Sequence, residues 1–284
     1  QAVIGSGSII GEGARVATGV KIWPEKTVAD RAVVTDHLRF GGRQPMVFEE
    51  TGFYGESAMV GETGVELTPE WCARLGAAIG STGQMDAARR GQSLCRIAVG
   101  CEDEKGNVAL ALKMALSSGL LAAGAKVWDF GCVAPTAFDY LVGFSQADFG
   151  VYLTGGTTGT VRLVELTGRV QALERDIEYR LSSGDLFRTR WQQIHPPVDM
   201  SGVRSAYSHY LAGLAGDLTG MTVDVRGCER QSILLLSMVL ADAGAQTGEN
   251  FRLHLGPGGR RLSLYDTTTG YIWPEQVIAL NAII

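Results

Sequence analysis

The sequence contains no block of Lys or Arg, no apolar run of membrane-spanning length and no Cys-x-x-Cys pair. With a formal net charge of −5 as well, the chain is a poor partner for nucleic acid or an anionic membrane. Its five cysteines are widely spaced, so we interpret them as small buried side chains in a reducing compartment, not as a disulfide framework or a metal site. No targeting segment is visible, and we expect a cytoplasmic protein that binds neither nucleic acid nor a membrane.

Histidine is scarce too, and none of the four histidines has a carboxylate or cysteine at ligand spacing. The sequence therefore predicts no histidine-based metal or catalytic site. Apolar residues make up 45% of the 284 residues and charged residues 19%, which is typical of a globular protein. This length allows two or three modest domains.

The first 40 residues repeat with a period of six. The repeated aliphatic positions are Ile4, Ile10, Val16, Ile22, Val28 and Val34. A helix would repeat every 3.6 residues and an exposed strand every two, so the period indicates a short left-handed parallel β-helix built from hexapeptide repeats.

Three hexads make one coil of such a helix, so these residues provide only two coils. Stacks of this kind need about three repeats to bury their core. We therefore expect the open amino-terminal end to be covered by preceding sequence or by another subunit, and the second case predicts a homo-oligomer through the β-helix. Because Gln1 already lies inside a repeat, we also expect the sequence to be a piece of a longer protein.

The remainder alternates helical and extended patterns. We divide it into a connecting segment at 41–66, an α/β domain at 67–198 and a second α/β domain at 199–284. The first domain is predicted to begin with a helix capped by Thr68, with Pro69 in its first turn. Its alternation of strands and helices predicts a parallel, doubly wound sheet. Further elements are expected at 96–101, 107–123, 125–131, 135–144, 149–155, 172–184, 207–216, 221–227, 231–244, 251–256 and 261–266, with a last helix from Pro274.

Ligands of open α/β sheets bind at the carboxyl ends of the strands. Those ends are predicted at the loops GCEDE (100–104), TGGTTGT (154–160), RGCER (226–230) and GPGGRR (256–261). A functional site, if the chain has one, is expected among these loops.

The runs ELTPEWCARLGAAIG, RIAVGCEDE and ALSSGLLAAGAKVWDFGCVAPTAFDYLV resemble the first domain of the α-D-phosphohexomutases, the phosphomannomutase and phosphoglucomutase group. FRLHLGPGGRRLSLYDTTTGYIWPEQVIAL resembles the second domain around its metal loop. The hexads resemble the β-helix that ends many sugar-phosphate nucleotidyltransferases. Together these parts resemble the carboxyl-terminal portion of bacterial fusions of a mannose-1-phosphate guanylyltransferase or NDP-sugar pyrophosphorylase with a phosphomannomutase-like tail. The resemblance implies a mixed fold, a short β-helix followed by two phosphohexomutase-like α/β domains.

The catalytic motifs of that family are altered at the matching positions. Where the family has the phosphoserine of a TASHNP loop, this chain has Gly156, with Thr154 on the family's threonine and Thr157 on its histidine. The three aspartates of the DGDxDR metal loop correspond to Gly256, Gly258 and Arg260. Where the family reads VGRDTR, the chain reads VGCEDE.

Glycine offers no oxygen nucleophile, and two glycines with an arginine offer no anionic ligand for Mg²⁺. Our main interpretation is therefore an assembly and regulatory region of a sugar-1-phosphate nucleotidyltransferase, with a degenerate mutase-like part. In that interpretation no cofactor is expected in this segment, and Mg²⁺ belongs to a catalytic domain that would precede it.

Two alternatives stay open. The chain could be an active phosphomannomutase or phosphoglucomutase fragment in which Thr154 or Thr157 replaces the serine. It could also be a phosphosugar-binding module, with Arg260 and Arg261 as phosphate-binding candidates. The candidate ligand is a phosphosugar or a nucleotide-sugar.

Overall fold

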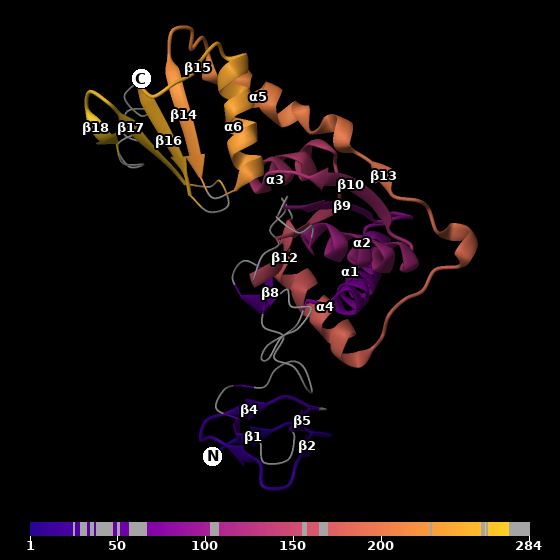
Figure 1. The fold of residues 1–284 in the computed structure, drawn as a ribbon. Helices are drawn as coiled ribbons and strands as arrows, with labels where there is room; N and C mark the ends of the chain where they lie inside the picture. The colour runs from indigo at the N-terminus through magenta and orange to yellow at the C-terminus, as the bar shows by residue number, and fades with distance from the viewer. Residues whose placement is uncertain are drawn as a thin grey trace.

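The structure is a computed structural model of the chain. It describes residues 1–24, 26–28, 33–34, 37, 48–49, 52–56, 67–102, 108–154, 158–164, 170–227, 229–256, 259 and 261–272. A group of very short strands at the amino terminus, a large sheet with helices on both faces and a smaller sheet with two helices follow one another along the chain (Figure 1). Among the described residues, no helix has both the length and the apolar character needed to cross a membrane.

Each hexad of the amino-terminal repeat forms one two-residue strand that ends on the repeated aliphatic residue. These strands are β1 (Val3–Ile4), β2 (Ile9–Ile10), β3 (Arg15–Val16), β4 (Lys21–Ile22), β5 (Thr27–Val28) and β6 (Val33–Val34). Each of the first three pairs in parallel with the strand three hexads later, β1 with β4, β2 with β5 and β3 with β6. The repeat thus gives a regular lateral pairing between hexads.

A small apolar core runs through these hexads. Val20, Ile22 and Val28 are buried, whereas Ile4 in the first hexad is 50% exposed. Close contact between the layers requires glycine at position 5, because a Cβ there would lie 2.2 Å from the Pro24 nitrogen. The repeat is therefore well packed toward its second half and open at its first.

The large sheet has seven strands in the order β13-β10-β9-β11-β12-β8-β7. Their bounds are β7 (Phe48–Glu49), β8 (Gly52–Glu56), β9 (Arg96–Cys101), β10 (Lys126–Cys132), β11 (Phe149–Leu153), β12 (Thr158–Val164) and β13 (Val198–Asp199). Strands β13, β10, β9 and β11 are parallel, but β12, β8 and β7 are antiparallel to their neighbours.

The predicted parallel arrangement is confirmed for β9, β10 and β11, whereas the antiparallel strands β12, β8 and β7 were not predicted. The physical reason is connection length, because a parallel return needs a crossover of a dozen or more residues. Only four residues separate the end of β11 from the start of β12, so the chain turns back as a hairpin. Within the segment predicted to be a connection, β8 pairs directly with β12. Strand β8 is hard to predict from strand propensities, because two of its five residues are glycine, which is depleted in strands.

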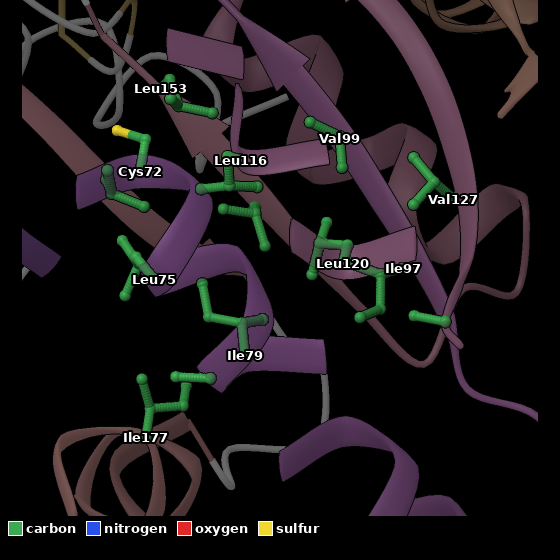
Figure 2. Packing of buried hydrophobic residues seen from close by; sticks show 14 of the residues in the cluster. Cys72, Leu75, Ile79, Ile97, Val99, Leu116, Leu120, Val127, Leu153 and Ile177 are labelled. Atoms are coloured by element: carbon green, nitrogen blue, oxygen red, sulfur yellow. The ribbon is translucent and has the colours of Figure 1, made fainter. Parts of the chain in front are cut away.

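Helices cover both faces of this sheet. They are α1 (Pro69–Arg89), α2 (Val108–Ala122), α3 (Pro135–Phe144) and α4 (Val170–Ser183). The predicted start of α1 is confirmed, since Thr68 Oγ1 accepts a hydrogen bond from the Trp71 N–H at 3.2 Å and Pro69 follows the cap. Helices α1, α2 and α4 share one core with the sheet, shown in Figure 2, and α3 packs on the opposite face.

The smaller sheet has five strands in the order β15-β14-β16-β17-β18. Its elements are α5 (Ser205–Ala215), β14 (Thr222–Gly227), α6 (Arg230–Asp242), β15 (Gln246–Thr247), β16 (Phe251–Leu255), β17 (Leu262–Asp266) and β18 (Gly270–Ile272), and short 3₁₀ turns lie at Trp191–Gln193 and Ser201–Val203. Again β17 and β18 are antiparallel additions to a parallel core. The helix predicted from Pro274 lies outside the described residues.

The two α/β units share one way of ending a helix. The similar segments LLAAGAKV and LADAGAQT both end a helix with a glycine of positive φ, Gly124 at +84° and Gly244 at +95°. A residue in this left-handed conformation is the usual way to end a helix and redirect the chain, here into β10 and β15.

Candidate functional site

The carboxyl ends of three parallel strands, β9, β10 and β11, are tied together by main-chain hydrogen bonds. The Glu102 N–H donates to the Leu153 carbonyl at 2.9 Å, and the Val133 N–H donates to the Cys101 carbonyl at 3.0 Å. Thr154, the family's threonine position, is half-buried at the end of β11. These ends form a rigid edge of the kind at which α/β sheets bind ligands.

A tyrosine and an arginine lie side by side next to this edge. Tyr152 on β11 is fully buried, and its hydroxyl donates to the Val133 carbonyl at 2.8 Å. Arg162, its register partner on β12, has its Cζ 5.5 Å from the Tyr152 ring centroid and forms a 2.8 Å ion pair with Asp139 of α3. The second guanidinium nitrogen of Arg162, Nη2, is buried and has no hydrogen-bond partner among the described residues.

Residues that follow strands β14 and β16 of the smaller sheet also lie near the first α/β unit. Glu229 comes just before α6, and its Oε2 accepts a hydrogen bond from Ser232 Oγ at 3.0 Å. A Cβ placed on Gly259, in the loop after β16, would lie 3.1 Å from Ser232 Oγ and 3.7 Å from Cγ2 of Thr136 on α3. The loop that resembles the family's metal loop therefore lies against the first domain.

The pKa of Tyr152 is affected by charged residues from both α/β units. Burial raises the pKa of its hydroxyl strongly, and the negative charges of Glu102 and Glu229 raise that pKa further, while the Arg162 guanidinium acts in the opposite direction. Tyr152 is therefore a neutral hydrogen-bond donor at any ordinary pH. Two carboxylates and one guanidinium thus act on the same tyrosine.

The structure describes only part of the two loops singled out in the sequence. Gly156 and Thr157 lie outside the described residues, as do Gly258 and Arg260. The Gly256 N–H donates to the Arg261 carbonyl at 2.9 Å, and the Gly256 carbonyl accepts the Gly259 N–H at 3.1 Å, which closes a tight turn. Arg261 is exposed beside this turn.

Mg²⁺, which the family resemblance implies for this loop, does not fit its residues. Magnesium requires hard oxygen ligands in a nearly octahedral arrangement. Gly256 has no side-chain oxygen, and its carbonyl already accepts a hydrogen bond. In the described part of the chain, no cluster of three or more histidine, cysteine, aspartate or glutamate side chains is placed to hold a metal ion.

Comparison with known proteins shows that the segment forming this edge is similar to one protein family. Residues 51–156 match the family described as phosphoglucomutase/phosphomannomutase, alpha/beta/alpha domain I. That segment is therefore similar to the first domain of the phosphohexomutases. The matched segment contains helices α1, α2 and α3 and strands β9, β10 and β11. It therefore includes all three strands whose carboxyl ends form the site edge.

Two curated relatives extend the phosphohexomutase likeness. A phosphoglucosamine mutase of Streptococcus sanguinis is 26% identical over 237 residues, which cover 79% of this chain and 49% of the relative. A phosphoglucomutase/phosphomannomutase of Thermococcus kodakarensis is 28% identical over 147 residues, or 50% of this chain and 31% of the relative. The chain thus spans about half the length, or less, of these relatives.

Solved structures share the fold. A phosphoglucomutase/phosphomannomutase family protein of Burkholderia thailandensis aligns with a TM-score of 0.62 and 15% identity, covering 83% of this chain and 59% of that one. For a phosphomannomutase-like protein of Thermus thermophilus the TM-score is 0.60 and the identity 18%, with 84% and 62% covered. The mixed α/β phosphohexomutase-like fold is therefore confirmed, while these comparisons give no support for a nucleotidyltransferase part.

Arg162, Tyr152 and Glu229 were not predicted from the sequence. The one available sign for Arg162 is that it is the only charged residue in the strand segment TVRLV. A lone charge in an apolar strand must find a partner or a ligand. Glu229 lies in the loop 226–230 that was predicted at a strand end, but the sequence did not single it out, because its effect on Tyr152 depends on contacts between segments far apart in the chain.

Proposed function

We propose that this phosphohexomutase-like region binds hexose phosphates at the shared edge of its two sheets. The observation that carries the proposal is the buried Nη2 of Arg162 beside β11, which has no hydrogen-bond partner in the described part of the chain, within a fold of the mutase type. A guanidinium recognises phosphate with charge-assisted, often paired hydrogen bonds. Asp139 holds one side of Arg162, which leaves the other side for an anion.

The polar groups around Arg162 suit a sugar as well as its phosphate. Glu102 and Glu229 supply carboxylates that can accept hydrogen bonds from sugar hydroxyls. Inorganic phosphate cannot form these hydrogen bonds, so we expect hexose phosphates to bind more tightly than inorganic phosphate.

Isothermal titration calorimetry of the full chain with the phosphates of glucose, mannose and glucosamine tests this proposal. We expect Arg162→Ala to weaken binding about tenfold to a hundredfold, the loss of a hydrogen bond to a charged group worth about 1.5–3 kcal/mol. Asp139→Asn is the matched control, because it breaks the ion pair but keeps the guanidinium. Binding that is unchanged in Arg162→Ala but lost in Arg261→Ala would move the site to the 256–261 loop and refute the proposal.

Active phosphomutase chemistry is a second candidate, because the relatives carry mutase names and Thr154 places a hydroxyl at the end of β11. It requires a threonine in place of the absent serine nucleophile. Conversion of glucose 1-phosphate into glucose 6-phosphate that disappears in Thr154→Ala or Thr157→Ala would establish it. Binding without conversion supports the phosphosugar-binding proposal alone.

For residues 1–40 we propose a left-handed parallel β-helix with a role in assembly. The support is the pairing of each strand with the strand three hexads later, as expected when three flat sides make one coil. The narrower proposal, that this part is the tail of a sugar-1-phosphate nucleotidyltransferase, rests on the hexads alone. A nucleotidyltransferase signature in sequence preceding Gln1 would support it, and a different catalytic domain there would refute it.

A further inference from the structure

Two cysteines lie opposite each other at the ends of neighbouring strands. Cys101 ends β9 and Cys132 ends β10, and they are direct register partners in the parallel pair. Their sulfur atoms are 3.5 Å apart, which is van der Waals contact. Cys101 is fully buried and Cys132 is half-buried, so small molecules can approach the pair from the Cys132 side.

A β-bulge produces this juxtaposition. The pairing of β10 with β9 slips between Asp129 and Gly131, so that Phe130 has no partner of its own. Without this extra residue Gly131, not Cys132, would oppose Cys101. Bulges of this kind redirect side chains and are frequent near functional sites.

The bulge is held in place by local contacts. Gly131 has φ of +70°, a conformation that glycine adopts without strain. Asp129 Oδ1 accepts the Gly131 N–H at 2.7 Å and lies 2.5 Å from the Lys113 ammonium, which is buried. The sulfur alignment is therefore supported by an ion pair between a buried lysine and a partly exposed aspartate.

We infer that Cys101 and Cys132 are a modification site, at which a peroxide oxidises the two thiols to a reversible disulfide. Disulfides join residues whose Cα atoms lie about 4.4–6.8 Å apart, and neighbouring strands are about 4.8 Å apart. Closing the bond therefore requires rotation of the two side chains and little movement of the strands. The inference does not depend on the proposed sugar-phosphate binding.

Exposure determines the order of steps. Burial raises the pKa of the Cys101 thiol, and its neighbour Cys132 raises it further, so Cys101 is protonated at neutral pH. The half-buried Cys132 sulfur attacks the peroxide, forming an S–O bond as the O–O bond breaks and water leaves. Cys101 sulfur then attacks the Cys132 sulfenic acid, forming the S–S bond while the S–O bond breaks, and its proton leaves with the hydroxyl as a second water. One peroxide is thereby reduced to two waters, and two thiols are oxidised.

The test treats the folded full chain with hydrogen peroxide, alkylates the remaining thiols under denaturing conditions and measures the mass. We expect loss of two hydrogen atoms and two fewer alkylation sites, both reversed by dithiothreitol. Trypsin cleaves after Arg96, Lys105, Lys126 and Arg162, so the linked product is peptide 97–105 joined to peptide 127–162. Cys228 lies outside the described residues, and its own tryptic peptide identifies any link that it makes.

Single variants distinguish this pair from general thiol oxidation. Cys132→Ser and Cys101→Ser should each abolish the linked peptide, whereas Cys72→Ser and Cys228→Ser should retain it. Because Cys101 is buried, circular dichroism melting is used to check that each variant is folded, and the half-buried Cys132 variant carries the decision. Oxidation of Cys132 to the sulfinic acid with no linked peptide, or a link from Cys101 to Cys228, would overturn the inference.

Discussion

Asp148 joins the end of helix α1 to the starts of strands β9 and β11 through one carboxylate. Its Oδ1 pairs with Arg90 Nη1 at 2.8 Å, and its Oδ2 accepts the Arg96 N–H at 2.7 Å. The side chain is only 5% exposed, in contrast with the surface pair of Arg89 and Asp176, whose side chains are 64% and 54% exposed. Two ion pairs near the end of the same helix thus differ in burial and also in length, which is 2.8 Å for Arg90–Asp148 and 3.8 Å for Arg89–Asp176.

This contrast gives a prediction at the residue scale. Asp148→Ala should lower the free energy of unfolding by about 1–3 kcal/mol, because it leaves the Arg96 N–H without its acceptor and leaves the Arg90 guanidinium with Asp86 as its remaining carboxylate partner. Asp176→Ala should change that free energy by less than about 1 kcal/mol, as exposed pairs do. Urea unfolding followed by circular dichroism measures both. Equal effects of the two substitutions would show that burial does not govern these pairs.

The altered motif positions of the candidate site could be assigned from the sequence, but its geometry could not. Thr154 and Gly256 were placed by resemblance, since both follow strands whose apolar pattern is clear. Arg162 needed its partner on α3, and Glu229 needed the second domain. Such contacts join residues far apart in the chain, and no local pattern encodes them.

At the scale of elements, α1 and α2 cross at glycines. A Cβ on Gly76 would lie 2.0 Å from the Leu116 carbonyl oxygen, and one on Gly119 would lie 2.0 Å from the Ala73 carbonyl oxygen. The two helix backbones therefore touch without intervening side chains. Gly213, within α5, is exposed and has no atoms within 4 Å of its Cβ position in the described part of the chain.

Alanine substitution should therefore act in opposite directions at these glycines. Gly119→Ala should destabilise the fold by about 1–3 kcal/mol or more, since the helices must separate. Gly213→Ala should stabilise it by up to about 1 kcal/mol, because alanine favours the helical backbone. Thermal melts of the two variants are sufficient to check this. A stabilising Gly119→Ala would mean that the crossing is looser than the structure indicates.

Most elements could be predicted because their apolar periods are clear and their caps are standard. RIAVGC became β9 without any change of bounds, and α1 begins at the predicted Pro69. Strand direction was harder, because β12 has the composition of any buried strand. Only the short connection to β11 reveals that it runs antiparallel.

For the whole molecule, two α/β units could be read from the sequence, but the contact between them could not. Tyr140 of α3 lies against Tyr207 and Tyr210 of α5, with ring centroids 4.9 Å and 5.2 Å apart. Aromatic pairs of this kind add specific attraction beyond simple burial. Because isolated tyrosines occur on many helices, this contact has no sequence signature.

The hexads carry the last prediction, which concerns assembly. Val3, Ile4 and Ile9 are 59%, 50% and 64% exposed, whereas Ile22 in the second coil is 2% exposed. Each aliphatic side chain yields about 1.5–3 kcal/mol when fully buried, so a second copy that covers this end would form a stable contact. We expect the full chain to be a homo-oligomer at micromolar concentration in sedimentation velocity experiments.

Substitutions at an exposed and at a buried aliphatic position of the hexads distinguish an effect on assembly from an effect on folding. Ile4→Asp should release monomers with an unchanged circular dichroism spectrum, because it places a charge on a surface that only association buries. Ile22→Asp should unfold the hexads themselves, since that side chain is enclosed within one chain. Thr27→Asp, on the exposed outer face of the second coil, is the control that should change neither property. A monomeric unmodified chain, or an oligomer that survives Ile4→Asp, would show that this end is not the interface.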